Sequence, residues 1–331
     1  MKLALYAEPL SDDKVQCHLC PHGCRISPGQ SGICRVRVNK EGTLYAANYA
    51  QVSSLALDPI EKKPLYHFYP GKDILSLGTV GCNLKCSFCQ NYGISQEDAH
   101  TRKLGPEQAV RLAKEQGPSC IGLAYTYSEP LMWYEYVLDT ARQAKAAGLK
   151  NVLVTNGFIQ PEPFKELLPF IDAMNIDIKS FQEDYYRRIC AGKLAPVLET
   201  VENAVAAGCH VEITTLVVPG LNDSPAEIKA LAGWIAELSP TIPLHLSRYF
   251  PQYKMDLPPT PLQTLKQALN ISREKLNYVY IGNAAADGGR DTYCPSCGAI
   301  LIRRSSLGIQ VMGCTEDGTC QHCQTKTNLI I

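Results

Sequence analysis

Three cysteines stand close together in residues 78–91, directly after an apolar run. They are Cys82, Cys86 and Cys89, with the spacing Cys-x3-Cys-x2-Cys. Thiolates at this spacing select zinc, Cu(I) or an iron–sulfur cluster, because a short loop can fold them around one metal centre. A structural zinc site normally has four protein ligands, whereas three ligands leave one coordination position open. The segment therefore predicts a metal centre with room for an additional group.

A second cysteine group lies near the N-terminus, where Cys17, Cys20, Cys24 and Cys34 follow the pattern Cys-x2-Cys-x3-Cys-x9-Cys. Four thiolates can close the coordination sphere of one ion, so we expect a structural zinc site in this segment. An auxiliary iron–sulfur cluster or a catalytic thiol would use the same residues, and both stay open as alternatives.

The third cysteine group is near the C-terminus, where Cys294-x2-Cys297 and Cys320-x2-Cys323 are separated by 22 residues. Two such pairs are typical of a zinc ribbon, and a rubredoxin-like iron site would use the same ligands. Four ligands leave no open position, so we expect this module to stabilise the tail rather than to act in redox chemistry or partner binding. Cys314 is a fifth cysteine that this site does not need.

Composition limits the classes of protein to which the chain can belong. It has 331 residues, 15 cysteines, and 32 basic against 32 acidic residues. The clustered cysteines favour metal binding in a reducing compartment, and the balanced charge offers nothing to attract nucleic acid or anionic lipid. The sequence has no apolar run of the ~18 residues that a membrane span needs, and no signal peptide is evident. We predict a cytoplasmic protein in which Cys120, Cys190 and Cys209 are small buried hydrophobes.

Short apolar runs alternate with amphipathic stretches between residues 76 and 283, as in repeated βα units around a parallel sheet. Strands are predicted at residues 74–80, 120–127, 151–155, 173–178, 210–218, 244–247 and 278–281. Helices are predicted at residues 106–116, 131–147, 161–168, 197–207, 225–238 and 261–269. Six or seven strands at this spacing favour a barrel or partial barrel over an open sheet.

Three regions are expected along the chain. Residues 1–58 form an N-terminal cysteine-rich metal-binding module with short strands at 36–38 and 43–47, residues 59–285 form the barrel, and residues 286–331 form the zinc-ribbon-like module. A linker rich in glycine and alanine is expected from Asn283 through Gly289. The prolines and aromatic residues of 62–71 predict an extended strap packed on the barrel, to which we assign no chemistry.

Polar residues stand on or directly after the predicted barrel strands. Glu129 lies among apolar residues, where a carboxylate needs a cationic partner. Asn156 has donor and acceptor groups suited to ribose hydroxyls, although Asn-Gly is also a common turn. Strand alternation directs Asp177 and Lys179 into the barrel, where they would pair with each other or with a ligand. His245, on the sixth strand, is either a ligand contact or a satisfied core histidine.

The Cys-x3-Cys-x2-Cys spacing, with Phe88 directly before the third cysteine, resembles that of the radical S-adenosylmethionine (radical SAM) enzymes. The strand-end segments 125–130, 155–157 and 177–179 resemble the relatives of pyruvate formate-lyase activating enzyme, although only Glu129 and Pro130 match the usual Gly-Gly-Glu-Pro. The two terminal cysteine modules resemble those of the radical SAM component of the AmmeMemoRadiSam system. This resemblance implies an α/β fold, a radical SAM partial barrel of the (β/α)6 type with a module at each end.

The resemblance also implies cofactors. Cys82, Cys86 and Cys89 would hold a 4Fe-4S cluster, and the amino and carboxylate groups of S-adenosylmethionine would occupy its fourth iron. One electron from the cluster would split the C–S bond and leave a 5′-deoxyadenosyl radical that abstracts hydrogen. Zinc at one or both terminal modules completes the expected cofactors. The residues implied to contact S-adenosylmethionine are Phe88, Tyr127, Glu129, Asn156, Asp177, Lys179 and His245.

We therefore predict a radical SAM oxidoreductase that acts on an unidentified protein or small molecule and receives electrons from a partner such as flavodoxin or ferredoxin. An activase of glycyl-radical enzymes is one alternative, and a non-catalytic scaffold with zinc in all three cysteine groups is another. The balanced charge disfavours RNA modification, which would need a basic patch. Glu212 and Arg248 lie on strands expected to face the barrel mouth, where they would recognise substrate or be paired or solvated.

Overall fold

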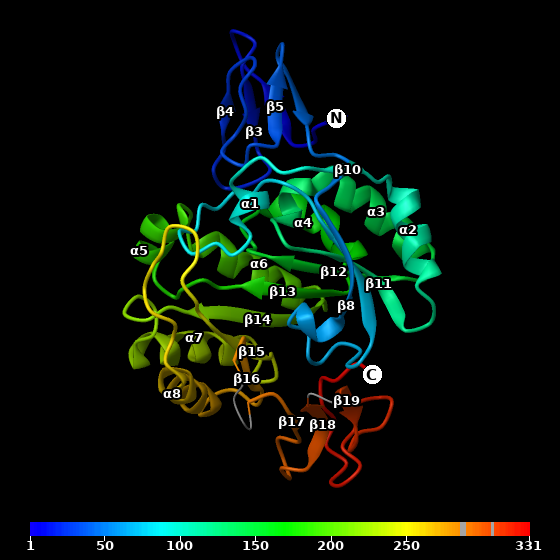
Figure 1. The fold of residues 1–331 in the computed structure, drawn as a ribbon, viewed down its shortest axis with the longest axis vertical. Helices are drawn as coiled ribbons and strands as arrows, with labels where there is room; N and C mark the ends of the chain where they lie inside the picture. The colour runs from blue at the N-terminus through cyan, green and yellow to red at the C-terminus, as the bar shows by residue number, and fades with distance from the viewer. Residues whose placement is uncertain (285–288, 306–307) are drawn as a thin grey trace.

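The computed structural model describes residues 1–284, 289–305 and 308–331. A small N-terminal module, a central barrel and a small C-terminal module follow one another along the long axis (Figure 1). Most of the predicted linker between Asn283 and Gly289 lies outside the described residues. The division of the chain at residues 58 and 285 therefore stays a prediction.

A mixed sheet of eight strands forms the barrel, in the order β16-β15-β14-β13-β12-β11-β9-β8. The strands from β9 to β16 pair in parallel, whereas β8 pairs antiparallel with β9 at one edge. The parallel order confirms the predicted α/β fold, but β8 was not predicted. The bounds are β8 Ser54–Pro59, β9 Asp73–Gly78, β11 Cys120–Tyr125, β12 Lys150–Thr155, β13 Ala173–Asp177, β14 His210–Val217, β15 Leu244–Arg248 and β16 Val279–Gly282.

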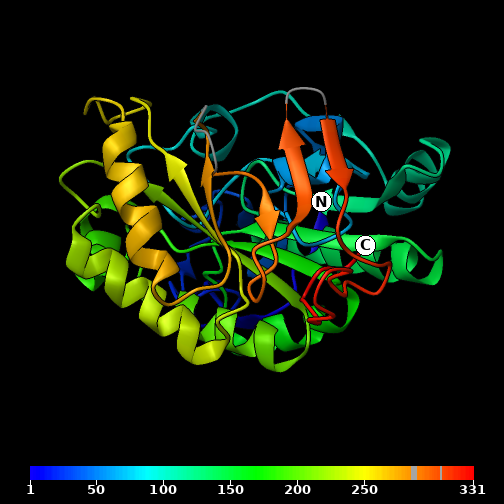
Figure 2. The same ribbon diagram turned by 90° about the horizontal axis from the view of Figure 1, so that it is seen from below.

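Helices cover the outer face of the parallel strands (Figure 2). Local sequence fixes several of their first turns: Pro106 begins α2, and the Ser224 hydroxyl before α7 accepts a hydrogen bond from the Glu227 backbone N–H at 3.2 Å. The α-helices are α1 Tyr92–Ser95, α2 Pro106–Glu115, α3 Tyr134–Ala146, α4 Pro161–Leu167, α5 Glu183–Tyr185, α6 Ala195–Ala206, α7 Pro225–Leu238 and α8 Leu262–Arg273. The other helical turns are η1 Ile60–Lys62, η2 Pro130–Trp133, η3 Leu168–Phe170 and a π-helical turn, η4 Tyr186–Cys190.

Alternation along β13 decides which side chains enter the barrel. Ile176 and Ile178 are completely buried in the main apolar core. Successive side chains of a strand point to opposite faces, so Asp177 and Lys179 point into the barrel, where both line its cavity. The structure is consistent with the prediction that Asp177 and Lys179 point into the barrel and that the two isoleucines point away from it.

The N-terminal module consists of two three-stranded sheets, β1-β6-β5 and β2-β3-β4. Its small core contains Val15, Leu19, Ile26 and Leu44, all nearly inaccessible. The predicted hairpin is present as β5 and β6, and a short β7-β10 pair links the module to the segment before α2. The bounds are β1 Lys2–Leu3, β2 Ala7–Pro9, β3 Val15–Cys17, β4 Arg25–Ile26, β5 Arg37–Lys40, β6 Thr43–Ala46, β7 Gln51–Val52 and β10 Arg102–Lys103.

The C-terminal module is a three-stranded antiparallel sheet of β17 Thr292–Tyr293, β18 Ile300–Ser305 and β19 Gly308–Val311. It contacts the strap of residues 62–71, which packs on the barrel as predicted. The Ile330 N–H donates to the His67 carbonyl at 2.8 Å, and the Arg304 guanidinium donates to the Tyr66 carbonyl at 2.6 Å. The strap therefore lies between the barrel and this module.

Candidate active site

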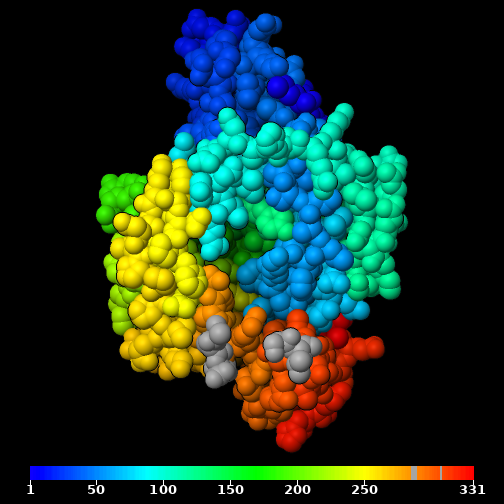
Figure 3. Space-filling view, in the orientation of Figure 1, coloured from blue at the N-terminus to red at the C-terminus, as the bar shows by residue number. Residues whose placement is uncertain are grey.

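A cavity of about 340 Å³ lies where the parallel strands end. Figure 3 shows it as a hollow near the middle of one face. A concave site with a few convergent polar groups is the usual form of a ligand-binding site. Its lining includes the three cysteines of the loop after β9, together with Phe88, Tyr127, Glu129, Thr155, Asn156, Asp177, Lys179, Thr214, Leu216 and Ser247.

The three cysteines, which we call the cluster loop (Cys82, Cys86 and Cys89), have hydrogen-bonding groups beside their sulfurs. The Leu84 N–H lies 3.4 Å and the Asn156 amide nitrogen 3.6 Å from the Cys82 sulfur. Burial raises the pKa of the Cys82 and Cys89 thiols. A metal centre would offset that effect, because thiols bind metals in the deprotonated form.

Cys190 lies against the cluster loop and is completely buried. A hydrogen bond with the Cys190 thiol lowers the pKa of Cys86. The backbone holds this contact, because the N–H of Lys85 donates to the Cys190 carbonyl at 2.8 Å. Sequence reasoning identified Cys190 as a buried small residue but missed its contact with Cys86, since the two cysteines are far apart along the chain.

Glu129 is a buried carboxylate at the end of the loop after β11. It accepts hydrogen bonds from the Thr155 hydroxyl at 2.6 Å, the Asn156 N–H at 2.8 Å and the Leu131 N–H at 3.0 Å. Burial raises the pKa of Glu129 to about 7, although these three donors favour the ionised form. Glu129 therefore lies in the cavity wall with an orientation fixed by its neighbours.

Lys179 and Asp177 form an ion pair in the cavity wall, with 2.7 Å between Nζ and Oδ2. Burial alone would lower the pKa of Lys179, but the Asp177 carboxylate and the nearby Cys86 sulfur raise it above its ordinary value. The lysine is therefore held in its cationic form. A structural ion pair and a ligand-binding cation are compatible here, because the pair remains in contact with the cavity.

The other predicted contacts on this side of the barrel also line the cavity. Asn156 forms the expected turn, its side-chain oxygen accepting from the Phe158 N–H at 2.9 Å. Tyr127 has a left-handed backbone with φ of 69°, and its hydroxyl donates to Asp58 at 2.6 Å. Phe88, which lies between Cys86 and Cys89 in the sequence, is buried. All of these residues lie together in the cavity wall, and their contact with S-adenosylmethionine stays a prediction.

Lys63 is a cavity residue that sequence reasoning missed, because the strap was given no chemistry. It is 1% exposed, and its ammonium lies 2.7 Å from the Asp58 carboxylate. Burial would raise the pKa of Asp58, but hydrogen bonds from Lys62, Lys63 and Tyr127 hold it below its usual range. The consecutive lysines before Pro64 were the available signal, because a buried lysine in an apolar strap needs an acidic partner.

His245 is not brought to the cavity. Its Nε2 lies 2.7 Å from the Glu212 carboxylate, and its ring packs edge-on against Tyr66 with centroids 4.8 Å apart. Ser247, two residues further along β15 on the same face, does line the cavity. His245 thus shares a strand face with Ser247 but lies outside the cavity lining, so its position fits the alternative of a satisfied core histidine and does not support the predicted contact with S-adenosylmethionine.

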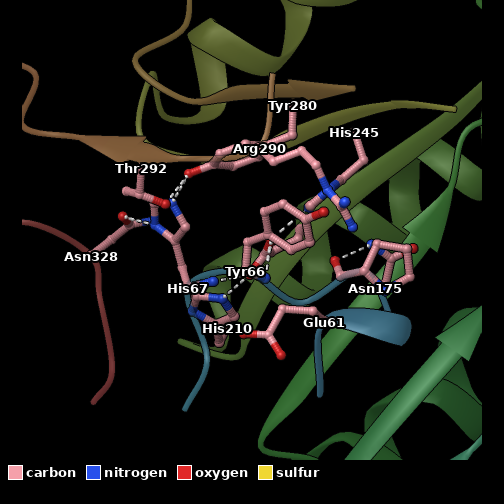
Figure 4. A network of polar contacts seen from close by, with 12 residues as sticks. Glu61, Tyr66, His67, Asn175, His210, His245, Tyr280, Arg290, Thr292 and Asn328 are labelled. Atoms are coloured by element: carbon pink, nitrogen blue, oxygen red, sulfur yellow. Dashed lines mark hydrogen bonds and ion pairs between the residues drawn. The ribbon is translucent and has the colours of Figure 1, made fainter. Parts of the chain in front are cut away.

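Figure 4 shows the polar network that contains Tyr66, His67, His210 and His245, and these four residues share the Glu212 carboxylate as a partner. The N–H groups of Tyr66 and His67 donate to this carboxylate at 3.0 and 2.7 Å, and His210 Nε2 lies 3.1 Å away. Burial opposes ionisation, yet the two histidines hold the pKa of Glu212 well below its usual value. Glu212 lies near the start of β14 and is paired rather than placed at the mouth.

The network continues into the C-terminal module (Figure 4). His67 Nε2 lies 2.7 Å from the Tyr280 hydroxyl, which lies 2.7 Å from the Thr292 hydroxyl. Arg304 donates to the same Thr292 hydroxyl at 2.8 Å. The network therefore joins the module to the end of the barrel opposite the cavity. Arg248, the other residue considered for the mouth, donates to the Thr260 carbonyl at 2.9 Å.

The C-terminal cysteines form a compact group of possible metal ligands. The sulfurs of Cys294, Cys297, Cys320 and Cys323 all lie within 4.8 Å of one another. Sulfurs around one tetrahedral zinc, each at ~2.3 Å from the ion, have such spacing. The group fits a single metal ion in a zinc-ribbon-like module, whereas Cys314 is buried outside it. The identity of the metal stays a prediction.

The N-terminal cysteines, Cys17, Cys20, Cys24 and Cys34, line a second and smaller cavity. Three of them are buried, and Cys24 is partly exposed. Their convergence agrees with the predicted metal-binding module.

Comparison with known proteins adds the family. The profile of the Radical SAM superfamily matches residues 76–232, the segment that carries the cluster loop and most of the cavity. The uncharacterized protein MJ0808 of Methanocaldococcus jannaschii is 44% identical over 338 residues, covering 100% of both chains. The chain belongs to the radical SAM superfamily. Membership implies a 4Fe-4S cluster and S-adenosylmethionine, and the cluster loop and cavity offer residues suited to both.

Other radical SAM relatives match only part of the chain. Pyruvate formate-lyase-activating enzyme of Clostridium pasteurianum is 29% identical over 165 residues, which cover 48% of this chain and 67% of the relative. GTP 3′,8-cyclase of Geobacter sulfurreducens is 34% identical over 152 residues, which cover 44% of this chain and 46% of the cyclase. The likeness to both relatives is therefore confined to less than half of this chain.

Among solved structures, Streptococcus suis SuiB bound to S-adenosylmethionine has a TM-score of 0.52 and 14% identity, covering 68% of this chain and 53% of SuiB. At this identity the likeness shows the fold alone. No helix within residues 1–284, 289–305 and 308–331 is long and apolar enough to span a membrane.

Proposed function

We propose that this protein reductively cleaves S-adenosylmethionine and uses the resulting radical to abstract hydrogen from a protein or small-molecule substrate. The observation that carries the proposal is the convergence of the cluster loop, Glu129 and the Asp177-Lys179 pair on one cavity. When bound, a 4Fe-4S cluster with S-adenosylmethionine would supply one electron and a 5′-deoxyadenosyl radical. The family membership described above supports this class of chemistry.

Different residues of the cavity bind different groups of S-adenosylmethionine. Lys179 offers a fixed cation to the carboxylate of S-adenosylmethionine, and Asp177 orients it at 2.7 Å. Glu129 offers an acceptor to the amino group, and the Thr155 hydroxyl holds its carboxylate in place. The Asn156 amide stabilises the thiolate form of Cys82. Glu129, Thr155 and Asn156 are buried and the Asp177-Lys179 pair is partly buried, so their electrostatic interactions are stronger than they would be in water.

Substrate would enter from the open side of the cavity, where Lys62, Gln90 and Asn91 form part of the wall. Reduction requires an external one-electron donor, such as flavodoxin or ferredoxin. We infer a substrate that reaches into a pocket of limited size, because the cavity has a volume of about 340 Å³ and only Lys62, Gln90 and Asn91 of its lining residues are exposed.

A glycyl-radical-enzyme activase is the second candidate. The likeness to pyruvate formate-lyase-activating enzyme of Clostridium pasteurianum supports it, as does that to benzylsuccinate synthase activating enzyme of Thauera aromatica, which is 27% identical over 117 residues. Within the superfamily, both terminal cysteine modules favour the radical SAM component of the AmmeMemoRadiSam system as the closer group.

The test is cleavage of S-adenosylmethionine by the anaerobically reconstituted full chain. We expect 5′-deoxyadenosine from the wild type with a low-potential reductant and none from Cys86→Ala, with Cys209→Ser as the matched control outside all three cysteine groups. Deuterated candidate substrates, including glycine-labelled partner proteins, would show where the abstracted hydrogen originates. If neither the wild type nor Cys86→Ala forms 5′-deoxyadenosine, the result would instead favour the zinc-binding scaffold.

A further inference from the structure

The sulfur atoms of the N-terminal cysteines are less closely grouped in space than those of the C-terminal site. In this respect the N-terminal cysteines resemble the cluster loop. Among the described residues, only Cys294, Cys297, Cys320 and Cys323 place three or more ligand atoms within 4.8 Å of one another. The N-terminal cysteines and the cluster loop each line a cavity, and neither group, both of which lie within the described residues, meets that 4.8 Å criterion. Thiolates that bind separate irons of one cluster stand further apart than thiolates around a single ion. The two wider groups therefore suit the same kind of centre.

A buried cation faces the N-terminal cavity. Arg37 lines it, is 1% exposed, and forms an ion pair with Glu135 at 3.0 Å. Its Nε is buried and has no hydrogen-bond partner among the described residues. An unpaired donor of this kind is costly, so an acceptor in the cavity would stabilise it. The sulfurs of an anionic thiolate-bound centre would provide that acceptor.

The N-terminal cavity directly adjoins the cluster loop. Gly81, just before Cys82, has φ of +90°, and a Cβ there would lie 2.7 Å from the carbonyl oxygen of Cys34. On the other side of Cys82, the buried side chain of Asn83 lies beside the Cys20 thiol. Figure 1 shows the N-terminal module beside α1, the helix that follows the cluster loop. Both sequence neighbours of Cys82 thus touch cysteines of the module.

Two further contacts hold this junction. His22 Nε2 lies 2.7 Å from the Asn83 carbonyl, and the Asn83 amide donates to the Phe158 carbonyl at 2.6 Å. The Asn156 amide lies 3.0 Å from the Asn83 side-chain oxygen as well as 3.6 Å from the Cys82 sulfur. Hydrogen bonds through Asn83 and Asn156 therefore connect His22 of the N-terminal module to Cys82, a ligand of the cluster loop.

We propose that Cys17, Cys20, Cys24 and Cys34 hold a second iron–sulfur cluster that delivers electrons to the cluster loop. A one-electron donor protein of the flavodoxin or ferredoxin class reduces the N-terminal cluster and is itself oxidised. The N-terminal cluster returns to its oxidised state when it passes that electron to the centre on Cys82, Cys86 and Cys89. This delivery step rests on the proposed function, whereas the presence of the second cluster does not.

Metal and sulfide analysis of the full chain, reconstituted without air, tests the cluster. We expect about eight irons, about eight sulfides and a single further metal ion at the C-terminal site per wild-type chain. The Cys17→Ser/Cys20→Ser double variant should lose about half of the iron and sulfide, while Cys209→Ser should lose none. Electron paramagnetic resonance of the reduced wild type should show magnetic interaction between two clusters. Four irons with zinc at both ends would overturn the proposal without affecting cleavage of S-adenosylmethionine.

The delivery step has its own measurement. In Cys17→Ser/Cys20→Ser, reduction of the cluster-loop centre by reduced flavodoxin should be lost, whereas reduction by the small molecule titanium(III) citrate should be retained. Unchanged reduction by flavodoxin would overturn the relay. The metal content and the spectrum of the wild type are measured without any substitution. They therefore test the second cluster even if the double variant fails to fold. Failure of Cys86→Ala to abolish cleavage would count against the proposed function alone.

Discussion

The Nζ atom of Lys179 lies 2.7 Å from Oδ2 of Asp177, and both side chains line the cavity that contains the cluster loop. Asp177 and Lys179 are two residues apart along the chain. Side chains two residues apart on a strand point to the same face, so strand alternation alone brings the two together. The ion pair keeps the ammonium charged and directed, which suits it to bind a carboxylate.

Replacing Lys179 with Met should weaken binding of S-adenosylmethionine. A hydrogen bond to a charged group contributes ~1.5–3 kcal/mol, so the Kd should rise on the order of tenfold to a hundredfold. Isothermal titration calorimetry on the reconstituted protein measures this change. Lys114→Met, on the exposed face of α2, is the matched control. A Kd within twofold of the wild type for Lys179→Met would contradict the assigned role.

Glu129→Gln should change how stability depends on pH. The folded pKa of about 7 lies above that of an unfolded glutamate, so the Glu129 contribution is fully present below pH ~4.3 and is lost as pH rises through about 7. The wild type should therefore lose up to about 4 kcal/mol relative to the variant across that window. Urea unfolding of both cluster-free proteins at several pH values gives the difference. Parallel curves would show that Glu129 is not strained by burial.

Cys190→Ala should leave the cluster assembled but lower its reduction potential. Hydrogen bonds to cluster sulfurs favour the reduced, more negative state, and the Cys190 thiol is hydrogen-bonded to Cys86. A hydrogen bond with a net value of ~1 kcal/mol corresponds to about 40 mV for a one-electron couple. Anaerobic redox titration followed by electron paramagnetic resonance measures the shift. Loss of iron from this variant would indicate instead that Cys190 is needed for assembly.

His245→Ala should reduce stability without weakening S-adenosylmethionine binding. It removes a partner of the buried Glu212 carboxylate, and an unsatisfied buried group costs ~1–3 kcal/mol. Differential scanning fluorimetry and calorimetric binding separate the two effects. Ser247→Ala, on the same strand face but in the cavity wall, is the matched comparison. A large rise in Kd for His245→Ala would restore the cofactor contact expected from sequence.

Cys320→Ser should release the metal of the C-terminal module, whereas Cys314→Ser should retain it. Only Cys320 belongs to the group of four sulfurs within 4.8 Å, although both residues are buried. The metal content per chain after gel filtration distinguishes the variants. Loss of metal from both, with the fold intact by circular dichroism, would mean that Cys314 also acts as a ligand.

The sequence was sufficient where a feature depends on neighbouring residues. The cysteine spacing indicated three metal-binding groups, and the alternation of apolar runs with amphipathic helices indicated the parallel sheet. Period-two alternation placed Asp177 and Lys179 inside the barrel, because the face of a strand is fixed by local geometry. The resemblance then led to Glu129 and Asn156, both of which line the cavity.

Only the tertiary structure decided how deep each inward residue lies and what it touches. Alternation gives the face of His245 but not its position along the barrel axis, which depends on the pairing of β15 with its neighbours. The contacts of Cys190 with Cys86 and of Arg304 with the strap join residues far apart in the chain. The same is true of the cluster loop. Its three cysteines are evident from spacing alone, but their contact with the N-terminal cysteines through Gly81 and Asn83 exists only after the chain has folded.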